Sequence, residues 1–440
     1  AAVNDPRAAR PGDDDDGDGD EWDGDGAPDV GTSSGSGTAS SGSTSSGSGS
    51  PASGESSPWG STEAETGEPL PARRPMSGSA RDSYRRGLEA ARRGDTAAAQ
   101  SAFQQALSAD PNAYQAAYNL GVLADRQGNA EQALTYYRQA LRIQADYELA
   151  ADGIVTIYVR RGQASDAVSF IEPLARRWVR NLRIQAIYGE ALVHAGRMED
   201  AVRAARAALR RDERYVPAML VLVKANLRLE RTELARSILD QALTIDPNNA
   251  ELQYIKGTML RAEGQLGTAM QEFRRAVELA PDYADARMAI ALQTLAGGNY
   301  AEAVTQFETV ARLVSDVPAV HLGLGNAYRA TKQWEKAKGE FDRVIALDPR
   351  QPEVHFALAL LYREAEGDFP GLDALTAYQR SQQEFQAYRA LMGSRLPRDD
   401  ASTGYMEELT RLIDRERRRI EREERQRARE AARAAEAASS

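Results

Sequence analysis

The chain has 440 residues, a formal net charge of −10 and no cysteine. The absence of cysteine excludes disulfides, thiolate catalysis and cysteine-ligated zinc, and it is compatible with an oxidising envelope compartment. No apolar run approaches the roughly 20 residues that a membrane-spanning helix needs.

Residues 1–79 carry most of the charge imbalance, because they hold fifteen acidic residues against four arginines. This segment is rich in Asp, Gly and Ser and buries too little apolar surface to offset its ordering entropy, so we expect a disordered tether. Its ends should lie roughly 50 Å apart. The chain begins at Ala1 rather than Met. Either a targeting segment has been removed or the chain is a fragment, and we expect removal.

Within the acidic run Asp13–Asp25, the twelve residues from Asp14 to Asp25 have the spacing of an EF-hand-like loop, with Asp in place of Glu at the twelfth position. Its neighbours are Gly, Pro and Asp, which do not form the flanking helices that such a loop requires. A solvated acidic run is therefore the default interpretation, calcium binding is the alternative, and we predict no metal site.

From residue 80 a period of 34 residues organises the chain. Alanine recurs at this step without insertion or deletion, at Ala99, Ala133, Ala167, Ala201, Ala235, Ala269, Ala303 and Ala337. A glycine stands twelve residues before the alanine in five repeats and five residues before it in six, and an aromatic residue follows by four residues in five repeats. This pattern predicts antiparallel helix pairs, with the first glycine and the alanine at their close approach. The second glycine belongs in the turn, where φ > 0 is needed, and the aromatic ring fills the space between neighbouring pairs.

These residues resemble the tetratricopeptide repeat (TPR) family. Residues 251–282 carry the clearest match, with motif positions at Gly257, Gly264, Ala269, Phe273, Ala276 and Pro281. The resemblance implies an all-α, right-handed TPR solenoid of about nine helix-turn-helix repeats, with a disordered N-terminal tail and a charged C-terminal helix. We expect eight repeats over residues 80–351, then a ninth degenerate repeat and a solvent-facing cap helix over 352–393.

A hinge at 394–404 and an Arg/Glu-rich helix over 405–440 complete the expected organisation. Residues 405–437 hold ten arginines and nine acidic residues, and opposite charges at i,i+4 can support a helix without tertiary packing. A heptad-like spacing that ends at Ile420 suggests a short coiled-coil seam, formed by Met406, Leu409, Ile413 and Ile420. Because the charges nearly cancel, we expect no nucleic-acid binding.

In TPR proteins the first helix of each pair lines a concave groove, so the resemblance implies that a few of its positions face a ligand. Aromatic residues recur at the fifth position and basic residues at the twelfth or thirteenth. The predicted partner-binding residues are Tyr84, Arg92, Tyr118, Arg126, Arg160, His194, Arg228, Tyr254, Arg261, Arg329, Phe356 and Arg363. Guanidinium groups bind carboxylates and stack on rings, which predicts acidic or extended peptide segments as partners. The alternative is that arginine simply ends these helices favourably for the helix dipole. We also expect the Asp13–Asp25 run to occupy this groove until a partner displaces it.

The sequence predicts neither an enzyme nor a cofactor. His321 and His355 occupy one slot of adjacent repeats, which favours core packing, and His194 stands alone. No nucleophile–base set, phosphate-binding loop or dinucleotide fingerprint is found.

We therefore predict a non-catalytic protein–protein interaction scaffold. The acidic, Ser/Gly-rich spacer is similar to the segment that follows a bacterial lipoprotein signal peptide, and the whole layout resembles TPR lipoproteins of myxobacterial gliding-motility machines. This resemblance implies the periplasmic face of the cell envelope, as an outer-membrane lipoprotein held only by a removed N-terminal anchor. The alternative is a cytoplasmic TPR adaptor or a regulatory subunit of an enzyme complex. The oligomeric state is left open.

Overall fold

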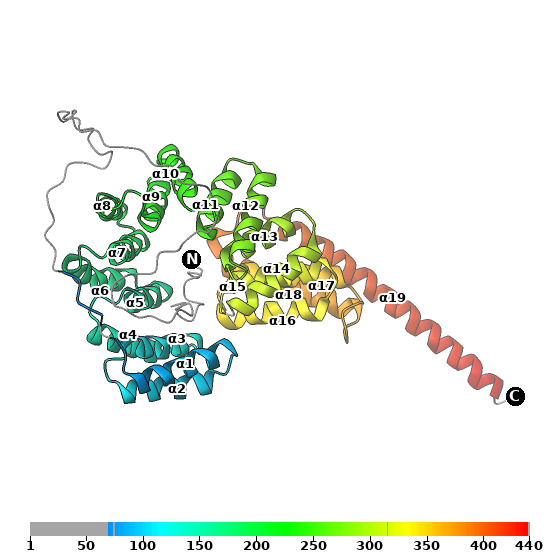
Figure 1. Cartoon of the computed structure of the whole chain (residues 1–440). Helices are drawn as coiled ribbons and strands as arrows, with labels where there is room; N and C mark the ends of the chain where they lie inside the picture. The colour runs from blue at the N-terminus through cyan, green and yellow to red at the C-terminus, as the bar shows by residue number, and fades with distance from the viewer. Residues whose placement is uncertain (1–68, 74, 315, 439–440) are drawn as a thin grey trace, which may run out of the picture. The chain divides into compact units, whose positions relative to one another are not determined.

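The computed structural model describes residues 69–73, 75–314 and 316–438, and all regular structure in these ranges is helical (Figure 1). The helices are α1 (Gly78–Arg92), α2 (Thr96–Ala109), α3 (Tyr114–Arg126), α4 (Ala130–Ile143), α5 (Glu148–Arg160), α6 (Ala164–Arg177), α7 (Leu182–His194), α8 (Met198–Leu209), α9 (Val216–Arg228), α10 (Thr232–Ile245), α11 (Ala250–Ala262), α12 (Leu266–Leu279), α13 (Ala284–Ala296), α14 (Tyr300–Leu313), α15 (Pro318–Ala330), α16 (Trp334–Leu347), α17 (Pro352–Ala365), α18 (Ala374–Met392), the short 3₁₀ helix η2 (Gly393–Arg395) and α19 (Ala401–Ala438). The all-α prediction is confirmed. Most of the expected tether, including Asp13–Asp25, lies outside the described residues.

The described helices belong to two compact units. The N-terminal unit contains α1 to α9, and the C-terminal unit contains α10 to α19 together with residues Arg160–Gly162. In both units the first helix of a repeat packs on the second helix that follows it, as α3 does on α4 and α15 on α16. Second helices pack in turn on the next first helix, as α16 does on α17. This succession of helix pairs is the expected TPR architecture.

The 34-residue pattern forms the core of each repeat. The eight repeat alanines are all buried, none more than 2% exposed. The first glycine lies against the aromatic ring of the second helix: a Cβ added at Gly257 would lie 2.6 Å from the Phe273 ring, and one at Gly121 would lie 2.5 Å from the Tyr137 ring. We expected this glycine to mark a close approach of two helices. The structure shows that the close neighbour is the ring.

The turn between the two helices of a repeat contains one residue with a left-handed backbone. Glycine takes this position with φ between 72° and 79° at Gly94, Gly128, Gly162, Gly196, Gly264 and Gly298. Lys332 stands at the same step of a later repeat with φ of 59°. A residue with a Cβ is disfavoured in this region. The sequence-based expectation of a positive φ is therefore confirmed, and the repeats that lack glycine carry the same turn.

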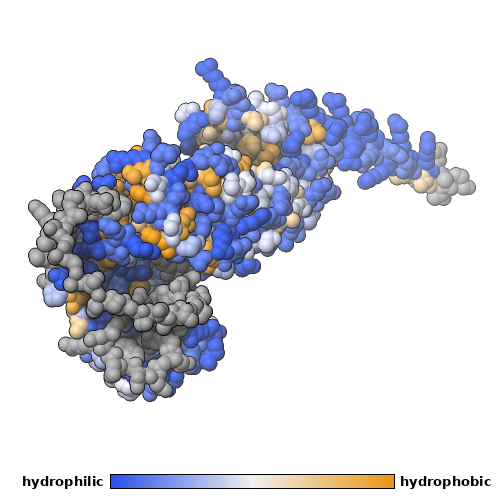
Figure 2. Space-filling model, turned by 45° about the horizontal axis from the view of Figure 1, so that its top comes forward, coloured by the Kyte–Doolittle hydropathy of each residue, from blue (hydrophilic) through white to orange (hydrophobic). Residues whose placement is uncertain are grey.

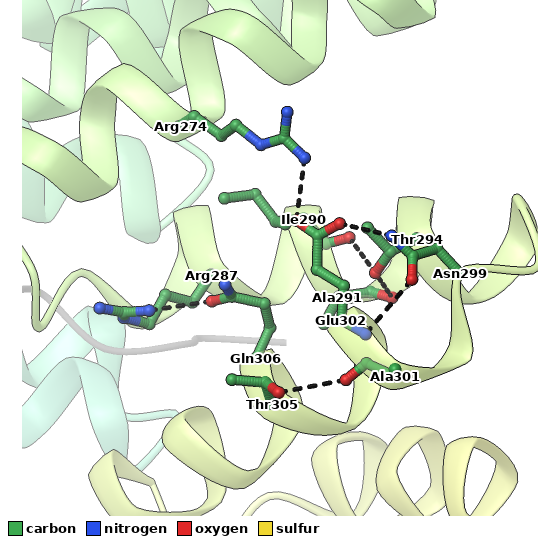
Figure 3. Close-up of polar contacts among 10 residues, drawn as sticks. All are labelled: Arg274, Arg287, Ile290, Ala291, Thr294, Asn299, Ala301, Glu302, Thr305 and Gln306. Carbon is green, nitrogen blue, oxygen red and sulfur yellow. Dashed lines mark hydrogen bonds and ion pairs between the residues drawn. The ribbon is translucent and has the colours of Figure 1, made fainter. Parts of the chain in front are cut away.

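Polar side chains cap and connect helices α12 to α14 (Figure 3). Asn299 caps α14, because its Oδ1 accepts a hydrogen bond from the Glu302 backbone N–H at 3.4 Å and its Nδ2 donates to the Glu302 carboxylate at 2.7 Å. Arg274 of α12 donates to the same carboxylate at 2.9 Å. Arg287 of α13 donates to Gln306 of α14, also at 2.9 Å. Exposed pairs of this kind stabilise the fold only weakly.

The C-terminal end differs from the expected solvent-facing cap. Helix α18 continues without a break to Met392, and its Phe385 is fully buried. The start of α19 covers this face, with Leu409 (0% exposed) and Ile413 (5%) in the same cluster as Phe385. Helix α19 begins at Ala401, inside the expected hinge. The apolar side chains at i,i+4 in its first turns are the physical reason for this docking.

The distal half of α19 extends beyond the helices of its own unit (Figure 1). Residues 421–435 are exposed, apart from a half-buried Glu423, and Figure 2 shows a hydrophilic surface along this rod. Arg419 bonds to Glu423 at 2.7 Å and Gln426 to Glu430 at 2.9 Å, both at i,i+4. Such pairs support an isolated helix. None of the described helices combines the length and apolar character needed to cross a bilayer.

Candidate partner-binding groove

The first helices of successive repeats in the C-terminal unit line a cavity of about 820 Å³. Its lining includes Leu295 of α13, Tyr300 of α14, Leu322, Asn326 and Arg329 of α15, Phe356, Leu360 and Glu364 of α17, Tyr388 and Met392 of α18, and Asp400 before α19. Positions separated by 34 residues occupy equivalent places, so Leu322 and Phe356 face the cavity together, as do Asn326 and Leu360. We call this cavity the α15–α17 groove.

The floor of the α15–α17 groove is apolar, and its Phe356 ring packs among other aromatic rings. Leu322, Phe356 and Leu360 supply it. The Phe356 ring is fixed by edge contacts with Tyr388, whose centroid lies 5.1 Å away, and with Tyr405 at 6.2 Å. A floor fixed in this way can bury an apolar side chain without first becoming ordered.

The rim of the α15–α17 groove is acidic. Arg329 is its one lining cation and is paired with Glu364, while Glu353 and Asp400 add two further carboxylates. Burial raises the pKa of Asp400, but hydrogen bonds from Ser402 outweigh that effect and hold the pKa below its ordinary value. Asp400 is therefore ionised at neutral pH. Three carboxylates against one guanidinium give the rim a negative field.

Asn326 is the one amide side chain of the lining. It is half-buried, and its amide makes no hydrogen bond to another residue in the described ranges. An amide side chain both donates and accepts, which matches the donor and acceptor of a peptide group. Asn326 and Leu360 were not among the sequence-predicted residues, although their 34-residue separation signals one face. Met392 and Asp400 could not be found in this way, because they lie outside the repeat.

The predicted basic residues all lie in the last turn of a first helix, namely Arg92, Arg126, Arg160, His194, Arg228, Arg261, Arg329 and Arg363. Of these, five are exposed, namely Arg92, Arg126, Arg160, Arg228 and Arg261.

Several members of this set have partners within the chain, and Arg261 lies 5.7 Å from the Phe273 ring centroid. Arg363 donates to both carboxylate oxygens of Glu408 at 2.9 Å and lies 4.9 Å from the Tyr405 ring centroid. The His194 Nε2 lies 3.3 Å from a Glu190 oxygen. Their position agrees with the helix-dipole alternative as well as with ligand binding, so partner binding by these residues stays a prediction.

The predicted aromatic residues pack on rings of their own repeat and of the repeat that follows. Tyr118 is 8% exposed, with ring centroids 5.6 Å from Tyr137 and 5.5 Å from Tyr147. Tyr84 packs on Phe103 at 5.6 Å. Tyr254 packs on Phe273 and Tyr283, and Phe356 contributes to the groove floor. Of the twelve predicted residues, the structure thus brings Arg329 and Phe356 to one cavity.

The two histidines of the 34-residue step each lie beside a glutamate of the following helix. His321 is fully buried, and its Nδ1 lies 2.6 Å from the Glu340 carboxylate, while the His355 Nδ1 lies 2.7 Å from Glu384. Core packing was the expected role of both. Among residues 69–438 with the gaps given above, no group of three metal-ligating side chains occurs.

Comparisons with known proteins agree with this architecture. Three family models, each described as a tetratricopeptide repeat, match residues 84–148 and 153–217, residues 192–258 and 294–361, and residues 250–283. The search of curated protein sequences gave no match.

Several solved structures are similar to this chain. One is the APC/C hetero-tetramer Cut9–Hcn1, at 13% identity and a TM-score of 0.45, covering 75% of this chain and 76% of that one. A second is pilF of Pseudomonas aeruginosa, at 18% identity and a TM-score of 0.42, covering 52% of this chain and 96% of that one. A third is a thermophilic TPR protein of Thermus thermophilus, at 25% identity and a TM-score of 0.37, covering 42% of this chain and 100% of that one. From the matched repeats and the succession of helix pairs, the chain belongs to the tetratricopeptide repeat family, whose repeats are scaffolds for protein–protein interaction.

Proposed function

We propose that this protein is a non-catalytic scaffold that binds an extended segment of a partner protein in the α15–α17 groove. The observation that supports the proposal is the combination of a fixed apolar floor with the amide of Asn326. Full burial of one Leu- or Phe-sized side chain contributes about 1.5–3 kcal/mol. The amide can bond the partner's backbone, so the groove suits an extended peptide with a bulky apolar anchor.

The charge of the groove specifies the flanking residue of that peptide. The acidic rim favours a Lys or Arg beside the anchor, because a carboxylate there would face three others. This differs from the acidic segments expected from the arginine pattern. For such acidic segments, Arg92, Arg126 and Arg228 of the N-terminal unit are the proposed contacts.

A peptide-display selection on the full chain tests the groove. We expect enrichment of sequences with a bulky apolar residue next to Lys or Arg, and loss of their binding in Leu360→Asp. The matched control is Leu347→Asp, which changes a leucine that is 42% exposed on the second helix α16. Selected peptides that bind Leu360→Asp as well as the parent, or a selection without enrichment, would refute the groove.

We also propose that the scaffold works in a bacterial cell envelope, within a machine such as that of gliding motility. The acidic, Ser/Gly-rich composition of residues 1–79 and the absence of cysteine support this placement. Fractionation of cells that express the tagged native gene should recover the protein with membranes. Recovery only from the cytosol would favour the alternative, a cytoplasmic adaptor or regulatory subunit.

A further inference from the structure

The N-terminal unit has a basic edge where three successive second helices end. Seven arginines form it in columns that follow the 34-residue step: Arg142, Arg176 and Arg210, then Arg177 and Arg211, then Arg180 and Arg214. Arg210 is half-buried, and the other six are exposed. The step places the members of one column at equivalent sites of adjacent repeats, so the charges form a continuous strip.

The TPR fold does not require this strip. Outside the basic edge, the equivalents of Arg142 are Ser108, Thr244, Glu278, Arg312 and Ala346. Four of these five are not cations, so a cation is not needed to end the helix. Nearby carboxylates offset only part of the charge. Glu172 pairs with Arg176 at 2.6 Å, and Asp212, Glu213 and Asp146 are further acidic residues of this edge. Glu148 is paired with Arg73. Seven guanidinium groups against the four carboxylates that remain leave a net positive surface.

The first described residues of the chain enter the fold at the basic edge. The Pro71 carbonyl accepts a hydrogen bond from Gln144 at 3.4 Å, and Arg73 pairs with Glu148 at 3.0 Å. The same α4–α5 loop receives the Trp178 indole N–H, which donates to the Ala145 carbonyl at 3.1 Å. Trp178 lies between Arg177 and Arg180 in the sequence. The first described residues and Trp178 therefore meet at the same α4–α5 loop.

The segment Asp13–Asp25 has the complementary chemistry. It contains nine acidic residues, no basic residue and one aromatic residue, Trp22. Arginine pairs with carboxylates and also stacks on indole. Forty-three residues separate Asp25 from Pro69, and a chain of that length can span up to about 140 Å. Covalent connection raises the effective concentration of the segment at the edge to about the millimolar range.

We propose that the basic edge of the N-terminal unit is the binding surface for the chain's own Asp13–Asp25 segment. This proposal is independent of the α15–α17 groove, whose acidic rim repels such a segment. It also replaces the sequence-based expectation that the acidic tail competes for the groove. The arginines of that expectation, such as Arg92 and Arg126, end first helices, whereas those of the basic edge end second helices. External acidic partners would have to displace the segment from the edge.

Energy transfer within the full chain tests the proposal, because a protein without cysteine can be labelled at introduced ones. Ala27→Cys and the exposed Ser169→Cys of α6 would carry a donor and an acceptor. We expect high transfer in about 20 mM NaCl and at least a roughly twofold fall in about 500 mM, because salt screens exposed charges. Arg180→Ser, Arg211→Ser and Arg214→Ser together should give low transfer at both concentrations.

The matched control removes three exposed arginines from the distal half of α19, with Arg422→Ser, Arg425→Ser and Arg429→Ser, and should behave as the parent. Circular dichroism checks that each variant is folded. A second arm leaves the folded unit intact and changes Asp13, Asp14, Asp15 and Asp16 to Ser, which should also abolish the salt-dependent transfer. Parental transfer in the edge variant would overturn the proposal. If the parent also binds anionic vesicles and the edge variant loses that binding while its transfer stays parental, the edge serves a membrane and not the Asp13–Asp25 segment.

Discussion

Lys332 occupies a turn position that six other repeats give to glycine, and we expect Lys332→Gly to stabilise the C-terminal unit. Its φ of 59° lies in the left-handed region, where a residue with a Cβ is disfavoured by roughly 1–2 kcal/mol. Glycine loses about 0.5–1 kcal/mol more backbone entropy on folding. The difference predicts a net gain of about 0.5–1 kcal/mol.

The converse change separates backbone conformation from steric contact. A Cβ added at Gly298, where φ is 79°, would meet no other atom within 4 Å, and the same is true of a Cβ at Gly267 within α12. Neither methyl group collides with a neighbour, so only the backbone conformation distinguishes the two sites. We expect Gly298→Ala to destabilise by about 1 kcal/mol and Gly267→Ala to stabilise by about 0.5–1 kcal/mol.

Hydrogen exchange read by mass spectrometry is the suitable assay, because a repeat array need not unfold in one step. Protection of α15 and α16 should rise in Lys332→Gly, and protection of α13 and α14 should fall in Gly298→Ala. Urea unfolding of the whole chain provides a second measurement. If Gly298→Ala and Gly267→Ala change local protection in the same direction, the reasoning from φ is wrong.

Three further changes test packing, capping and the docking of α19. Gly325→Ala places a methyl group within 3 Å of the Phe341 ring; it should cost about 1–3 kcal/mol, seen as a lower unfolding temperature. Asp373→Ala removes the N-cap of α18, at a cost of about 1 kcal/mol. The hydrogen bond from the Thr376 backbone lowers the pKa of Asp373, so its contribution is present at neutral pH and lost as pH falls through that pKa. The difference between parent and Asp373→Ala should therefore disappear in acid. Arg363→Met breaks the bidentate pair that holds α19, and proteolysis near residues 401–413 should become faster.

The architecture could be predicted because one spacing carries it. The alanine step, exemplified by Ala99 and Ala337, identifies residues that are fully buried in the structure. The step of Gly94 identifies the left-handed turn even where Lys332 replaces glycine. Such local constraints repeat in every helix pair, so the sequence contains several independent copies of the same information. The family, the helix pairing and the turn conformation all follow from it.

The site was less predictable, because it depends on contacts that do not repeat. Arg363 has the same place in its helix as Arg329, yet its guanidinium is held by Glu408 of α19. Nothing in the 34-residue step indicates that partner. In α19 the charged residues dominate the sequence, while the docking rests on a few apolar side chains such as Leu409. Asp400 enters the groove only because α19 packs there.

The distal half of α19 has a geometric consequence for anything attached to it. A helix supported by its own ion pairs keeps a fixed rise of about 1.5 Å and a rotation of about 100° per residue. Residues 421–438 would therefore hold an attached domain about 27 Å from the last packed turn. Inserting seven residues would move that domain outward by about 10 Å at nearly the same azimuth, whereas inserting two would turn it to the opposite side. The number of residues in this part of the helix thus sets both the distance of the attached domain from the packed turns and the side of the helix on which it lies.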